Sequence, residues 1–104
     1  MTTVPLKIAG GFSDLQPATE RIQNYCNEVK KQVEAKTNQK YVEFKAVTYR
    51  SQIVAGMNYI IEIQVNECHY IHVKLHQELP CNGGKIVLIN VQENHKKDDP
   101  LVPF

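Results

Sequence analysis

An apolar segment stands where this chain would be expected to make a polar turn. Residues 41–50 and 57–65 are rich in β-branched and aromatic side chains with partial period-two alternation, which is typical of strands. The link between them, residues 51–56, includes Ile53, Val54 and Ala55 and only one glycine. Hairpin turns in water usually carry Asn, Asp, Pro or Gly. The segment therefore predicts a loop whose apolar tip enters a partner's groove.

Two more strands are predicted after this hairpin. In residues 69–76, Ile71, Val73 and Leu75 fall on one face, and the side chains between them fall on the other. Residues 77–84 are expected to form a loop, and residues 85–92 the last strand. Because strands 57–65 and 69–76 are antiparallel, residues 52–56 and 79–81 should lie at the same end of the sheet.

The segment before the hairpin predicts one amphipathic helix over residues 17–36. Ile22, Cys26, Val29 and Val33 recur at helical intervals, and Pro17 suits a first turn. A helix followed by an antiparallel meander predicts an α+β fold, with one long helix packed on a single sheet.

Several motifs, in order along the chain, resemble those of the cystatins, which are inhibitors of papain-like cysteine peptidases. Residues 52–56 match the pattern Gln-x-Val-x-Gly of that family. The chain is similar in particular to the stefins, the small intracellular branch, over about its whole length. The other matching segments are Gly10-Gly11, Gln16-Pro17-Ala18-Thr19, Lys45-Ala46-Val47, Asn58-Tyr59, Leu79-Pro80 and the tail from Lys96 to Phe104.

The resemblance implies a cystatin-like fold and reversible, tight-binding, competitive inhibition of peptidases of the cathepsin L, B, H and S type. An N-terminal arm and two hairpin loops would form a wedge that fills the active-site cleft, with no catalytic residue and no cofactor. The residues implied for the wedge are Ile8, Ala9, Gly10, Gln52, Ile53, Val54, Ala55, Gly56, Leu79, Pro80 and Cys81. Gln52 is expected to brace its loop rather than to touch the enzyme.

Two departures from the family pattern bear on the wedge. Cys81 stands where stefins often have glycine or histidine, and residues 82–84 predict a looser second loop that contributes less to binding. The segment before Gly10 is also several residues longer than in the short stefins.

Composition and charge limit the function classes. With 104 residues the chain is expected to be a single domain, with a flexible arm at 1–9 and a polar, solvated tail at 93–104. The net charge of +1 is spread along the chain and does not suggest a nucleic-acid partner. No apolar run is long enough for a membrane span, and the first residues lack the pattern of a secretory signal. We therefore expect a cytoplasmic protein.

The cysteines support the same expectation. Cys26, Cys68 and Cys81 are an odd set without Cys-x-x-Cys spacing, which argues against a disulfide framework and against a zinc site. Reduced thiols in the cytosol are the simplest interpretation.

The same residues also allow other interpretations. Ile53 and Val54 could pack back on their own sheet, Gly10-Gly11 could be a flexible junction, and Leu79-Pro80 could simply end a strand. The main competitor is a cystatin-fold interaction protein with weak or no protease inhibition. The chain is expected to be mainly monomeric, although an opened first hairpin would permit a domain-swapped dimer that loses the wedge.

Enzymatic and metal functions are disfavoured. For Cys81 to act as a nucleophile, His72 or His76 would have to lie within hydrogen-bond reach as its base, and a third residue would have to orient that base. No known catalytic signature surrounds Cys81. His72 and His76 lie four residues apart on a predicted strand, roughly 13 Å, which is too far for one metal ion. These histidines are expected at the surface.

Overall fold

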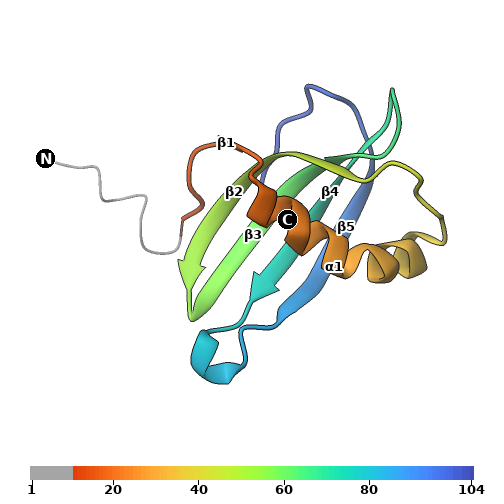
Figure 1. The fold of residues 1–104 in the computed structure, drawn as a ribbon. Coiled ribbons are helices and arrows are strands. Elements are labelled where there is room, and N and C mark those ends of the chain that lie inside the picture. Colours follow the sequence, from red (N-terminus) through yellow and green to blue (C-terminus); the bar gives the residue numbers. More distant parts are fainter. Residues whose placement is uncertain (1–10) are drawn as a thin grey trace, which may run out of the picture.

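The computed structural model describes residues 11–104, in which one helix crosses one face of a five-stranded antiparallel sheet (Figure 1). The strands are hydrogen-bonded in sequence order, each to the next. The elements are β1 (Gln16–Pro17), α1 (Glu20–Thr37), β2 (Lys45–Val54), β3 (Gly56–Gln64), β4 (Tyr70–Gln77), the short 3₁₀ helix η2 (Pro80–Asn82) and β5 (Ile86–His95). The predicted α+β fold is confirmed. Predictions for the arm at 1–9 and for Gly10 lie outside the described residues.

The helix begins later than predicted because Thr19 caps it. The Thr19 hydroxyl accepts a hydrogen bond from the backbone N–H of Ile22, and Pro17 lies in β1, paired with Thr48. At the other end, Asn38 adopts a left-handed conformation with φ of 59° and closes the last turn through Glu34. No helix among residues 11–104 is long and apolar enough to cross a membrane.

The predicted apolar stripe forms the core between α1 and the sheet. The four stripe residues of the helix are buried, and they pack against the inward side chains of the strands. The strand residues of this core include Ala46, Tyr59, Ile61, Ile63, Ile71, Val73, Leu75 and Ile86. The alternation predicted for residues 69–76 is therefore confirmed for the helix-facing side.

The first long strand lies further along the chain than predicted. Residues 41–44 precede it, and β2 instead continues through residues 51–54, where each residue pairs with one in β3 up to Val54 opposite Gly56. The predicted six-residue link is thus a tight turn at Ala55. The ladder continues because residues 51–54 have strand propensity and an antiparallel partner within reach.

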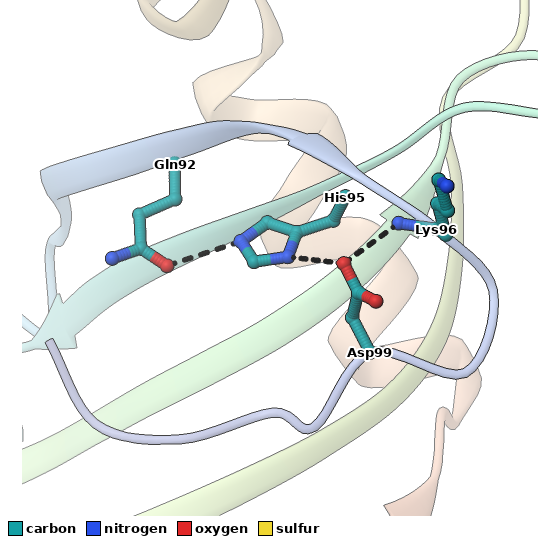
Figure 2. Close-up of polar contacts among 4 residues, drawn as sticks. All are labelled: Gln92, His95, Lys96 and Asp99. Atoms are coloured by element: carbon teal, nitrogen blue, oxygen red, sulfur yellow. Dashed lines mark hydrogen bonds and ion pairs between the residues drawn. The ribbon is translucent and has the colours of Figure 1, made fainter.

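The outer face of the sheet is covered by the C-terminal segment, which corrects two predictions. His72 is 1% exposed and not a surface residue, and Leu101 in the expected solvated tail is buried. Figure 2 views this face, with the C-terminal segment in front of the sheet and the helix behind it. The Lys74 ammonium donates a hydrogen bond to the backbone oxygen of Phe104, which fixes the end of the segment across β4. Residues 93–95 belong to β5.

His95 links the end of β5 to the C-terminal segment. One of its ring nitrogens, Nδ1, lies 2.9 Å from a carboxylate oxygen of Asp99, and Nε2 lies 3.1 Å from Oε1 of Gln92 (Figure 2). The same Asp99 oxygen accepts the backbone N–H of Lys96, and this hydrogen bond and His95 lower the pKa of Asp99. The His95 ring stacks on His72, with centroids 3.6 Å apart. The His95 ring thus covers His72 and keeps it from solvent beneath the C-terminal segment.

Burial of His72 predicts a loss of stability in mild acid. Burial, followed by the neighbouring His95, lowers the pKa of His72 to about 4. The unfolded chain takes up a proton at this side chain near pH 6.5, and the folded chain does so only near pH 4, so stability falls as the pH drops between these values. The loss from this group is on the order of 3 kcal/mol. Burial raises the pKa of Glu62, so this carboxyl group contributes to the pH dependence in the opposite direction. It offsets part of the stability lost through His72.

The check is the free energy of unfolding in urea at several pH values between 7 and 4, for the wild type and for His72→Gln. The variant should lose much of the pH dependence. The matched control is His69→Gln, at an exposed turn residue, which should keep the wild-type slope. Equal slopes for the wild type and His72→Gln would contradict the assignment.

Candidate functional site

The apolar tip of the first hairpin projects from one end of the sheet. Ile53 is 66% exposed and Val54 39% exposed, and Ala55 is exposed at the turn between them and Gly56. The side chains do not pack back on their own sheet, which removes the alternative raised for them from the sequence. Strand pairing on both sides of Ala55 holds the tip as a narrow ridge (Figure 1).

Gly56 fixes the base of this tip against β4. Its φ is +104°, and a Cβ built at this position would overlap the carbonyl oxygen of Gln77. Only glycine satisfies both the backbone angle and the close approach. Since Gln77 is the last residue of β4, this contact ties the first hairpin to the start of the second loop.

The second loop lies at the same end of the sheet, as predicted (Figure 1). Leu79 is 38% exposed, and Pro80 and Cys81 are exposed in the short helix η2. The loop is more ordered than the sequence suggested. Four backbone hydrogen bonds close it: Asn82 to Leu79, Gly83 to Pro80, Gly84 to Leu79, and Glu78 to Lys85.

The root of the N-terminal arm is held near the first hairpin. The backbone N–H of Ser13 donates to the Ser51 carbonyl at 2.7 Å, and the Ser51 N–H donates to the Ser13 hydroxyl at 3.1 Å. Ile8, Ala9 and Gly10 lie outside the described residues, so their expected place in the wedge stays a prediction. Ser13 is nevertheless hydrogen-bonded to Ser51, the residue directly before Gln52. The arm therefore starts beside the first hairpin. Ser13 was not predicted as a site residue, because a lone serine gives no signal of its distant partner.

Gln52 belongs to a hydrogen-bonded row across three strands. Its side-chain oxygen accepts a hydrogen bond from the Asn58 amide at 2.9 Å, and the Asn58 oxygen lies 2.7 Å from Nδ1 of His76. The three residues are direct cross-strand partners. Asn58 and His76 were missed as candidate site residues, although the pairing register of the predicted strands contains the signal.

The exposed end of the two loops carries no charge of its own. Residues 51–61 and 79–84 contain no Asp, Glu, Lys or Arg. Covering these loops therefore removes apolar groups from water without stripping a charged side chain of its hydration. Such an end suits an uncharged groove and a largely apolar contact.

The arrangement offers little to a thiol enzyme. His76 is engaged with Asn58, and His72 is sealed beneath the C-terminal segment, away from the loop that carries Cys81. Cys26 is fully buried in the core, and burial raises the pKa of its thiol to about 12, which keeps it protonated and unreactive. Among residues 11–104 no group of three or more His, Cys, Asp or Glu side chains could share a metal ion.

Gly56→Ala should destabilise the protein by about 1–3 kcal/mol more than Gly83→Ala. Gly83 has nearly the same φ, +107°, but a Cβ there would meet only the Glu78 side chain at 3.8 Å. The control thus carries the same backbone strain without the clash. Urea unfolding of both variants measures the difference, and equal free energies would show that the approach to Gln77 is not tight.

Comparison with known proteins agrees with this geometry. The family described as Cystatin domain matches residues 10–98. The chain is 44% identical over 97 residues to Cystatin-A of Felis catus, which covers 93% of this chain and 99% of that protein. It is 45% identical over 95 residues to Stefin-C of Bos taurus, which covers 91% of this chain and 94% of that protein. It is 44% identical over 97 residues to Leukocyte cysteine proteinase inhibitor 1 of Sus scrofa, which covers 93% of this chain and 94% of that protein.

These matches extend over nearly the whole length of the chain and of each relative. They include the helix, all five strands and both exposed loops. The names of the relatives are those of inhibitors and not of enzymes. The protein therefore belongs to the cystatin family, in its type 1 or stefin branch.

Proposed function

We propose that this protein is a reversible, tight-binding, competitive inhibitor of papain-like cysteine peptidases. The observation that carries the proposal is the pair of uncharged, apolar loops at one end of the sheet, held on a hydrogen-bonded frame. Ile53, Val54 and Leu79 expose their side chains there, and nothing in residues 11–104 covers them. Membership in the stefin branch supplies the partner class.

Inhibition follows from the shape of the hairpin tip. A cysteine peptidase attacks a carbonyl that lies in line with its thiolate, with the reacting atoms about 3–3.5 Å apart. A tip that turns within one residue at Ala55 fills the groove without laying an extended peptide across the thiolate. The inhibitor therefore occupies the substrate site and is not cleaved.

Affinity comes from apolar contact with a preformed surface. Burying the exposed parts of Ile53, Val54 and Leu79 contributes about 25 cal/mol for each Å² removed from water. The ladder up to Val54 and the hydrogen bonds of the second loop are already formed, so little conformational entropy is lost on binding. Pro80 restricts the second loop further. Cys81 is proposed to lie at the edge of the same contact.

The finer assignments are part of the proposal. We propose peptidases of the cathepsin L, B, H and S type as targets, and the cytoplasm as the location. The active form is proposed to be the monomer. A domain-swapped dimer hinged at residues 52–56 would straighten the turn at Ala55, and it would thereby lose the tip that enters the cleft.

The primary test is titration of papain and cathepsin L with the monomeric protein, following hydrolysis of a fluorogenic peptide. Stoichiometric, reversible inhibition that is overcome by excess substrate is expected. A folded monomer that does not inhibit either enzyme would overturn the proposal, and would favour a cystatin-fold interaction protein with other partners.

Val54→Asp and Leu79→Asp should each raise the inhibition constant at least about tenfold, because a buried carboxylate without a partner is costly. Their stability should stay close to that of the wild type, since both side chains are exposed. The matched control is Val42→Asp, at a fully exposed valine before β2, at the opposite end of that strand. Equal effects of all three substitutions would argue against a contact at the loops.

Gly10→Glu tests the contribution of the arm. The substitution should weaken inhibition far more than it lowers the free energy of unfolding, because a side chain at this position would keep the arm from the cleft wall. Inhibition constants and urea unfolding are measured on the same samples. An unchanged inhibition constant would remove the arm from the mechanism.

A further inference from the structure

A row of polar side chains crosses the sheet just below the first hairpin tip. Gln52, Asn58 and His76 come from β2, β3 and β4, and all three are half-buried. Asn58 stands at the centre, with its amide nitrogen on Gln52 and its amide oxygen on His76, at 2.9 Å and 2.7 Å. Each side chain therefore restrains its neighbour on the adjacent strand.

The row of Gln52, Asn58 and His76 lies where the first hairpin extends beyond the rest of the sheet. Beyond it, β3 and β4 have one further pair, Met57 with Gln77. Of the first hairpin, only the last pair, Val54 opposite Gly56, extends beyond the pairing of β3 with β4. The row is thus the last side-chain connection on its face of the sheet before the exposed tip.

The pattern of donors makes the row selective for its residues. The Asn58 amide nitrogen donates to the Gln52 oxygen, so the Asn58 oxygen is left to accept from the ring of His76. Nδ1 of His76 must carry a hydrogen to donate. A leucine in place of His76 would fill similar space but leave the Asn58 oxygen without a partner. An asparagine in place of His76 would put its amide nitrogen close to the position of the His76 Nδ1 atom.

His76 also touches the base of the tip. Its Cε1 atom lies 3.2 Å from the point where a Cβ on Gly56 would stand, so the ring lines the backbone at Gly56. The next residue, Gln77, supplies the carbonyl that packs against Gly56. After Gln77 the chain enters the second loop within two residues. A shift of His76 would therefore move both loops.

We propose that Asn58 and His76 are positioning residues, which hold the first hairpin tip in its binding conformation and fix it relative to the second loop. The inference rests on the proposed inhibitory function. Neither side chain needs to touch the peptidase. They act by keeping Gln52 and Gly56 in place, so that the free protein already has the shape that binds.

The test compares three variants of the full chain: His76→Leu, His76→Asn and Asn58→Ala. Two readouts are made on each, the inhibition constant for papain and the hydrogen exchange of the backbone amides of Val54, Ala55 and Gly56 in the free protein. Asn58→Ala and His76→Leu should raise the inhibition constant about tenfold, which corresponds to a tip in its binding conformation about a tenth of the time. Exchange at the tip should accelerate. His76→Asn should restore both readouts most of the way.

The matched control is Gln64→Ala, which removes a half-buried amide from the same strand and face as Asn58 but from the far end of β3. It should leave inhibition and tip exchange unchanged. Wild-type inhibition constants in both Asn58→Ala and His76→Leu, or an equal loss in Gln64→Ala, would overturn the assignment. Should His76→Leu not fold, Asn58→Ala decides.

The two proposals can fail separately. If the wild-type protein does not inhibit papain, the proposed function falls, and exchange at the tip still decides whether the row orders the hairpin. If the wild type inhibits and the tip exchanges equally in all variants, the function stands and the positioning role is wrong.

Discussion

The binding end of this molecule depends on how closely the backbone of Gly56 approaches the carbonyl of Gln77. No side chain fits between them, so the turn of the first hairpin and the end of β4 are held as one unit. The second loop starts directly from that unit and is closed by its own backbone hydrogen bonds. Two loops that lie more than twenty residues apart in the sequence thus share one frame. Their relative position is set by the backbone and does not need to be established when a partner arrives.

Behind this end, the sheet is stabilised differently on its two faces. The helix covers one face with an apolar core, in which Cys26 and Val29 are wholly buried. The C-terminal segment covers the other face, where Glu62 and His72 are buried. A sheet enclosed on both sides is a rigid support, which suits loops that must keep their shape while exposed. The buried histidine of the outer face is expected to make that support sensitive to acid.

The sequence predicted the helix stripe, the strand alternation and the apolar hairpin tip, because each is a local pattern with a period. It did not predict where β2 ends, since residues 51–54 suit either a loop or a strand until their partner in β3 is known. It placed His72 at the surface because alternation assigns a side chain to a face without revealing what covers that face. The segment that covers it, around Leu101, is short and has no periodicity. The partner of Ser13 was equally out of reach, because a hydrogen bond between distant residues leaves no local pattern. The partners of Asn58 follow only once the register of the strands is known.

The absence of charge from the two exposed loops has a kinetic consequence. Association that is guided by opposite charges is fast at low salt and slows as ions screen the attraction. An end with no Asp, Glu, Lys or Arg in residues 51–61 or 79–84 gains no such guidance from its own side chains, and it loses none when salt is added. Encounters with a target should therefore proceed at the ordinary rate for docking two surfaces, and that rate should be nearly independent of ionic strength. The same neutrality gives the two loops no preference for an acidic or a basic rim around a target groove.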